Sequence, residues 1–247
     1  MVSHTRLPLL CSVGEYLQEL PRHFSSDTAV AQNSAFLRAL AADEAPERLI
    51  HEILADREAL SRIASRSYRH ANGFDKILLF DSRQAGAYRL SIHHWYSAHG
   101  ESPSKDEPIH NHRFSFWSHI FRGTMSASVY TECDCAEEGS AFLPRYRYLP
   151  TSTGNVHTCK YDREACVKRV ASTTYSTGDV YYLNYKILHR VHAPGYGQRL
   201  CTFVLRGPRE QEYAETYNLS YPRDVVAYST PVMHADELGA VLTRILG

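Results

Sequence analysis

The chain has 247 residues, and its 27 lysines plus arginines balance 27 aspartates plus glutamates. A formal net charge of zero provides no field to attract nucleic acid or an anionic membrane, so a small molecule is the expected partner. The length suits one domain with helical flanks. No stretch approaches the roughly 20 apolar residues of a membrane-spanning helix, and the apolar run Leu7–Val13 is too short for a signal peptide. We therefore expect a soluble, cytoplasmic protein.

Residues 1–70 have helical periodicity. Two apolar stripes recur at helical spacing: Phe36, Leu37 and Leu40, and then Leu49, Ile50, Ile53 and Leu54. Pro46 precedes the second stripe at a favourable first-turn position. This segment is predicted to be a helical flank that packs outside the core formed by the rest of the chain.

The periodicity changes to that of strands near Lys76. Ile77–Phe80 is an apolar run, Gln84–Gly86 has the composition of a turn, and residues 88–96 alternate between apolar and polar. Later strand-like segments extend to Arg199–Leu205. We expect a single β-barrel over residues 71–208.

A histidine pair stands in the segment Pro108–Phe116. His110 and His112 are separated by one residue, so on a strand both imidazoles face the same side. Imidazole is the commonest metal ligand in proteins. The pair predicts half of a metal site.

A second segment supplies the other half. Gly178 and Asp179 open a predicted strand, and His189 follows eleven residues after the glycine. The chain has 14 histidines, and the competing candidates are His93, His94, His99, His119, His157 and His192. His119 is out of phase with His112, and His192 is on the opposite strand face from His189 or in a supporting position. We therefore predict His110, His112 and His189 as the ligands.

These two segments resemble the paired motifs of the cupin superfamily. Gly123 and His189 stand at motif positions, whereas Phe116 occupies the place of the cupin glutamate. The resemblance extends to the three-histidine thiol dioxygenases, the cysteine dioxygenase-like cupins. It is carried by Trp95–Gly100, Pro108–Arg113 and Leu188–Val191, and it covers roughly residues 68–208.

The resemblance implies a mainly β cupin barrel, or jelly roll, with Fe(II) held by three neutral ligands. Imidazole also suits Ni, Mn, Cu and Zn, so the ligand type alone leaves the metal open. Arg69 matches the family segment that binds the substrate carboxylate, and Arg89 is the next candidate. The remaining expected substrate-contacting residues are Trp95, Phe114, Phe116, Phe203 and Leu205.

Phe203 and Leu205 stand where the family has its catalytic histidine and tyrosine. This difference predicts an apolar wall opposite the metal, which would make cysteine a poor substrate and favour a larger or aromatic metabolite. Tyr182 and Tyr185 approach His189 in sequence and are candidates for the lost catalytic tyrosine. Arg113 and Arg190 directly follow ligands, so alternation points them away from the metal and into structural salt bridges.

The stretch from 124 to 177 is far longer than a hairpin requires, which predicts an insertion near residues 131–175. Residues 209–247 form a C-terminal extension, in which Leu238, Val241, Leu242 and Ile245 define a final amphipathic helix. The six scattered cysteines are expected to be free thiols in a reducing compartment.

The sequence predicts a mononuclear non-haem iron oxygenase whose substrate is a small polar metabolite that chelates the metal. Dioxygen would be the co-substrate, and the sequence is compatible with a homodimer. One alternative is a metal-dependent cupin isomerase or cyclase, in which the metal acts as a Lewis acid. Another is a cupin that binds a ligand without catalysis.

Overall fold

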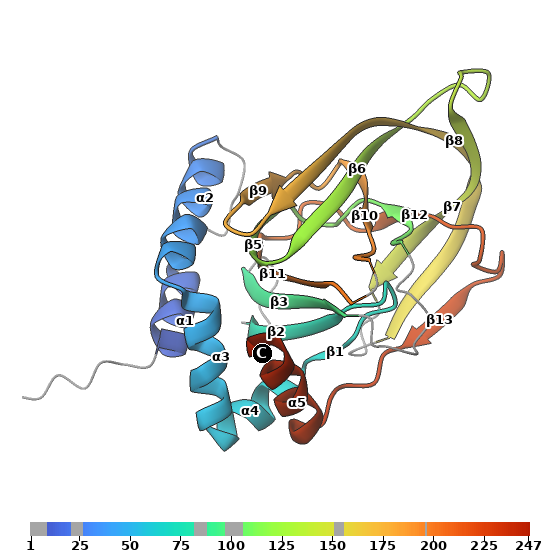
Figure 1. Ribbon diagram of the computed structural model, residues 1–247. Coiled ribbons are helices and arrows are strands. Elements are labelled where there is room, and N and C mark those ends of the chain that lie inside the picture. Colours follow the sequence, from blue (N-terminus) through green and yellow to red (C-terminus); the bar gives the residue numbers. More distant parts are fainter. Residues whose placement is uncertain (1–8, 21–26, 82–87, 97–105, 151–155, 196) are drawn as a thin grey trace, which may run out of the picture.

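The computed structural model describes residues 9–20, 27–81, 88–96, 106–150, 156–195 and 197–247 (Figure 1). The helices are α1 (Leu9–Glu19), α2 (Asp27–Ala42), α3 (Ala45–Ala55), α4 (Arg57–Ala64) and α5 (Ala235–Leu246). The strands are β1 (Tyr68–Arg69), β2 (Asp75–Asp81), β3 (Arg89–Tyr96), β4 (Ile109–His110), β5 (Phe116–Arg122), β6 (Thr124–Glu132), β7 (Ser140–Pro150), β8 (Val156–Ser176), β9 (Val180–Leu183), β10 (Leu188–His192), β11 (Arg199–Arg206), β12 (Ala214–Tyr217) and β13 (Val226–Ser229).

Eight of the strands have the order of a jelly roll. One sheet runs β3-β11-β5-β9 and continues through β2 to β1, while the facing sheet contains β8-β6-β10-β4. All of the pairings within these two sheets are antiparallel. Two interleaved four-stranded sheets of this kind form a jelly roll. The predicted mainly β fold with N-terminal helices and a C-terminal helix is confirmed.

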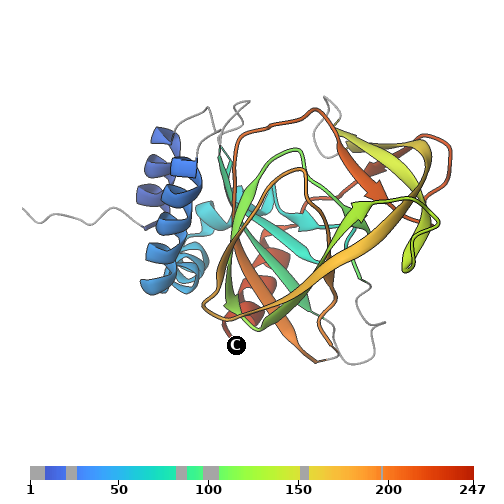
Figure 2. The ribbon, with the colours of Figure 1, turned by 90° about the horizontal axis from the view of Figure 1, so that it is seen from above.

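The helices cover the outer face of the first sheet, as Figure 2 shows from above. Leu90, Ile92, Phe203 and Leu205 alternate outward along β3 and β11 and pack with apolar residues of the helices, including Leu37 and Ile53, into the main core. Because side chains alternate along a strand, the intervening residues of β3 and β11 face the inside of the jelly roll. The helical flank therefore fixes which residues line the interior.

The predicted insertion builds a second ring of strands. β7 pairs with both β8 and β12, and β12 pairs with β4, so the order β8-β6-β10-β4-β12-β7 closes on itself. Ile109, Val167, Leu188 and Tyr217 form the apolar core inside this second ring. β4 and β10 therefore have one face in the jelly roll and the other in the second ring.

The expectation of six free cysteines is wrong. Cys135 and Cys166 form a disulfide, with their Cα atoms 5.2 Å apart, whereas Cys11, Cys133, Cys159 and Cys201 are free. Cys135 lies in the segment that follows β6, and Cys166 lies in β8, the strand that pairs with β6. The positions are 31 residues apart in sequence, and only the antiparallel pairing of β6 with β8 brings them together.

Gly123 shows why the first motif ends in glycine. It has φ +86°, and a Cβ atom there would lie 2.1 Å from the carbonyl oxygen of Arg199. A residue with a side chain would therefore clash with the backbone of β11 in this sharp turn between β5 and β6. Within the described part of the chain, no helix combines the length and the apolar character needed to cross a membrane.

Candidate metal centre

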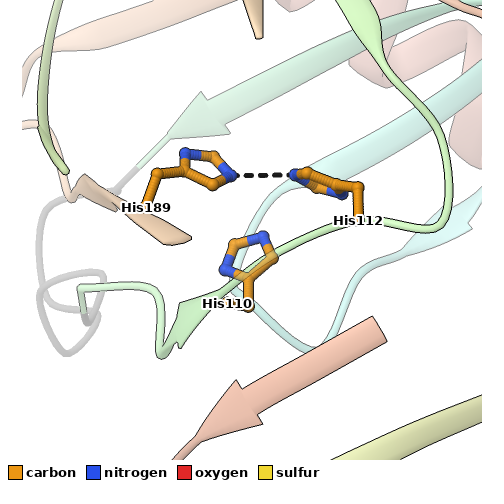
Figure 3. A group of neighbouring side chains, drawn as sticks. All are labelled: His110, His112 and His189. Atoms are coloured by element: carbon orange, nitrogen blue, oxygen red, sulfur yellow. Dashed lines mark hydrogen bonds between the residues drawn. The ribbon is translucent and has the colours of Figure 1, made fainter. Parts of the chain in front are cut away.

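The three predicted histidines come together inside the jelly roll (Figure 3). His110 on β4 and His189 on β10 are direct partners in the antiparallel ladder, and His112 follows in the loop after β4. Figure 3 shows the three imidazole rings turned toward one another. One nitrogen of each ring lies within 4.8 Å of the others, so the three side chains could hold one metal ion.

The distances fit a single divalent metal. His112 Nε2 and His189 Nε2 are 2.8 Å apart. Two imidazole nitrogens that each bind a metal at about 2.1 Å lie about 3 Å apart when their bonds make a right angle. The pair is therefore spaced like neighbouring ligands of one ion.

Backbone contacts prepare His110 and His112 for this role. The carbonyl oxygen of Pro108 lies 2.8 Å from His110 Nδ1. Because a carbonyl can only accept, Nδ1 carries the proton and the Nε2 lone pair is free for a metal. The backbone N–H of His112 donates to the Tyr185 carbonyl at 3.2 Å, and the side-chain amide of Gln211 donates to the His112 carbonyl at 2.7 Å. These bonds fix the loop that follows β4.

All three imidazoles are held in the neutral form. Burial, with a smaller contribution from nearby charges, lowers the pKa of His112 and His189 well below the ordinary value of 6.5, and it also lowers that of His110. A neutral imidazole has a lone pair to offer, whereas a protonated one has none. The site is therefore ready to bind a cation near neutral pH.

A buried carboxylate that the sequence reading missed stands beside the histidines. Glu107 Oε2 lies 4.0 Å from His110 Nε2, and the Glu107 side chain is 5% exposed. Burial raises the pKa of Glu107 to about 7. The one sequence signal was an acidic residue three positions before the first histidine, outside the cupin motif.

Aromatic rings lie beside the histidines. The Phe116 ring lies 5.0 Å from the His112 ring and 6.2 Å from the His189 ring, between ring centres. The Phe114 ring lies 5.5 Å from that of His112. Trp95 also faces the interior, where it packs in an apolar cluster with Val191. Phe116 therefore places an aromatic ring where the cupin motif has a carboxylate.

Phe203 and Leu205 do not form a wall opposite the metal, and this prediction is wrong. Both side chains lie in the core under the helices. The neighbouring residues of β11 that face the interior are Thr202, Val204 and Arg206, on the same strand face as Leu200. The polar Thr202 removes the basis for excluding cysteine as a substrate.

Tyr182 is displaced by the same one-residue shift. It packs against the helix-covered core beside Trp117, whereas Tyr181 faces the interior, where its ring lies 6.1 Å from Phe116. Tyr185 contributes its backbone to the site, through the carbonyl that accepts from His112, and its N–H donates to Ser115. The catalytic role predicted for Tyr182 is wrong, and the interior tyrosine on β9 is Tyr181.

The two predicted arginines differ in position. Arg69 Nη1 bonds Asp75 Oδ1 at 3.0 Å with a half-exposed side chain, and His94 bonds the other oxygen of the same carboxylate. Arg69 is therefore held in an ion pair with Asp75. Arg89 faces the interior and pairs with Asp81 at 2.7 Å. His99, another histidine considered, lies outside the described residues.

The competing histidines His119 and His192 lie apart from the group, as predicted. His119 on β5 faces the helix side, where its ring lies 6.5 Å from that of Phe121. His192 bonds Ser128 at 2.8 Å and Asp106 at 2.7 Å. Both serve as controls for the three histidines.

Comparison with protein families gives no match, and none of the curated proteins matches the sequence. Similar solved structures include a W96Y variant of Bacillus subtilis oxalate decarboxylase (14% identity, 63% of this chain and 31% of that chain, TM-score 0.35). Another is Lactobacillus farciminis oxalate decarboxylase in its formate complex (11% identity, 61% of this chain and 32% of that chain, TM-score 0.34). A third is tomato vicilin (14% identity, 68% of this chain and 35% of that chain, TM-score 0.34). The chain spans about a third of the length of these proteins. Similarity at this level carries no inference about activity.

Proposed function

We propose that this protein is a mononuclear non-haem iron oxygenase with a cupin fold, related to the thiol dioxygenases. The observation that supports the proposal is the convergence of His110, His112 and His189 inside the jelly roll, with two of their nitrogens 2.8 Å apart. Fe(II) is the proposed metal because of the resemblance to that family, and Ni, Mn, Cu and Zn are the other metals that imidazole ligands suit.

The ligand set explains which substrates the site favours. Three neutral imidazoles leave the charge of a divalent ion undiminished, so an anionic donor on the substrate is attracted to it. When bound, the metal supplies a Lewis acid and, as iron, the capacity for redox chemistry with dioxygen. The chain itself positions the ligands through the Pro108 and Tyr185 carbonyls and places the apolar rings of Phe114 and Phe116 beside them. A small anionic metabolite and dioxygen are the proposed partners.

One observation favours a second candidate, a metal-dependent isomerase or cyclase. Glu107 places a buried carboxyl group 4.0 Å from His110. Such a group could transfer a proton while a metal polarises a carbonyl. This reaction would consume no dioxygen.

Oxygen uptake by the iron-loaded protein separates the two candidates. The substrate panel comprises cysteine, 3-mercaptopropionate and aromatic amino and hydroxy acids, with product measured in air and under anaerobic conditions. We expect at least one substrate to consume dioxygen in proportion to product, and the His189→Ala variant to consume none. Equal product formation without dioxygen would contradict the oxygenase and support the second candidate.

A further inference from the structure

Four basic side chains lie near the three histidines, and three of them face the inside of the jelly roll. Arg89 on β3 and Arg206 on β11 alternate with Leu90 and Leu205, which face the helices, so both arginines face the interior. Lys76 on β2 faces the same way, since its neighbour Ile77 lies in the helix-covered core. The fourth side chain, Arg113, directly follows the ligand His112, and its charge acts on both Lys76 and Arg206.

These cations lie close enough to repel one another. Arg206 and Arg89 are direct partners in the antiparallel ladder, an arrangement in which like charges destabilise a sheet. Arg113 was expected to form a structural salt bridge, but its Nη1 atom is buried without a hydrogen-bond partner among the described residues. Buried polar groups left unpaired are rare in folded proteins, so each one requires an explanation.

The close placement of these cations lowers the pKa of two of them. Burial, and then the charges of Arg206, Arg89 and Arg113, lower the pKa of Lys76 to about 7. Burial, and then the charge of Arg89, lower the pKa of Arg206 to about 9. A negative charge bound among these side chains would relieve this repulsion.

The basic group borders the metal centre. The Arg206 guanidinium carbon lies 4.5 Å from the centre of the Phe114 ring, and that ring lies 5.5 Å from His112. The charge of Lys76 acts on both His112 and Glu107. One small molecule could therefore reach the histidines and the basic group at the same time.

We propose that Lys76, Arg89, Arg113 and Arg206 form an anion-binding subsite that holds a second, doubly charged group of the substrate, a phosphate ester or a pair of carboxylates. The assignment of this anion to the substrate rests on the proposed function. Asp81 pairs with Arg89 and Glu107 acts on Lys76, so these two carboxylates offset two of the four positive charges and leave an excess of two. A single carboxylate would leave part of that excess unmatched, whereas a doubly charged group would balance it.

Calorimetric titration of the purified full-length protein tests the subsite, with inorganic phosphate and succinate as the probes. The variants are Arg206→Gln and Lys76→Met. The matched control is Arg199→Gln, which removes one charge from the other, exposed end of β11, where Arg199 bonds the Arg244 carbonyl. Metal content and circular dichroism are recorded for each protein.

We expect saturable binding of one of the two probes, weakened about 10- to 100-fold in Arg206→Gln and Lys76→Met and unchanged in Arg199→Gln. The preferred probe decides between phosphate and carboxylate chemistry. If neither probe binds, or if all three variants weaken binding equally, the subsite is refuted. Should one variant fail to fold, the other decides the outcome by the same criterion.

Failure of the subsite and failure of the proposed function give different results. A protein that binds the probe but holds no metal at its histidines retains the subsite and loses the oxygenase. A protein that holds iron and consumes dioxygen but binds neither probe retains the oxygenase and loses the subsite.

Discussion

Two arginines experience opposite surroundings in neighbouring parts of the molecule. Arg145, inside the second ring, bonds Glu132 and Glu215 at 3.1 Å each and also bonds Asp162. Arg206, inside the jelly roll, has the like charge of Arg89 opposite it in the ladder. Burial lowers the pKa of Arg145, but the hydrogen bonds that Arg145 donates to Asp162 and the charges of the carboxylates outweigh it and raise that pKa, whereas burial and like charge lower the pKa of Arg206.

The two regions differ in whether their buried charges are paired within the protein. The second ring supplies every partner that Arg145 needs, so its charges serve stability. The jelly roll interior leaves cations in excess and neutral imidazoles facing one another, so its charges are arranged for something that binds there. Substitutions in the two regions should therefore have opposite consequences for stability and for binding.

The largest stability loss is expected for Arg145→Met. This change removes the one cation that three carboxylates share and leaves each with its remaining partners alone, so it should lower the free energy of unfolding by about 3 kcal/mol. The lower end of the range for buried pairs applies because the carboxylates are 18–34% exposed. Urea denaturation measures it, and Arg147→Met, a half-exposed arginine on the same strand, is the control, expected to lose less than about 1 kcal/mol. Equal losses in both variants would show that Arg145 is no more important than a surface arginine.

The loss of stability caused by Arg145→Met should depend on pH. Burial opposes ionisation of Glu132 and Asp162, but bonds from Tyr217 and Arg163 to the first and from Arg145 to the second outweigh it and hold each pKa below its ordinary value, 4.5 and 3.8. A carboxyl whose pKa is lower in the folded state adds stability above its unfolded pKa and loses that contribution as the pH falls through the folded pKa. The stability gap between wild type and Arg145→Met should therefore persist at pH 7 and shrink below about pH 4. A gap that grows in acid would reverse the assigned sign.

The smallest effect is expected for Arg206→Met. Relief of repulsion from Arg89 offsets the lost contact with Phe114, a cation–π interaction worth about 1 kcal/mol, so the free energy of unfolding should stay within about 1 kcal/mol of wild type. The same urea titration measures it. A loss as large as that of Arg145→Met would mean that Arg206 is stabilised by more than its bond to the Gly207 carbonyl and its contact with Phe114, and it would remove the contrast between the two regions.

The sequence predicted the three histidines and the fold well because those signals are local. His110 and His112 share a strand face by spacing alone, and the helical stripes before residue 70 mark the segment that covers the sheet. The glycine at 123 is required by one turn. Each of these signals can be recognised in the sequence without knowing which strands pair.

The face of β11 could not be predicted in the same way. Leu200, Cys201, Phe203, Val204 and Leu205 are all buried, because helices cover one face and the barrel interior the other. A strand buried on both sides has no apolar alternation to reveal its phase, and an error of one residue exchanges the two faces. The polar Thr202 and Arg206 were the local signs of the interior face.

The basic group and the disulfide were beyond sequence reasoning for a different reason. Lys76, Arg89, Arg113 and Arg206 come from separate segments that only the jelly-roll order brings together. The Cys135–Cys166 bond likewise depends on the pairing of β6 with β8. No spacing along the chain encodes either arrangement.

The most direct test of the account is metal analysis of purified variants, with circular dichroism to confirm folding. His110→Ala, His112→Ala and His189→Ala should each lose bound metal, because each removes one of three converging nitrogens. His119→Ala and His192→Ala should keep about one ion per chain, as wild type should, because these rings lie apart from the group. Full metal content in a folded His189→Ala protein would contradict the metal centre and, with it, the proposed function.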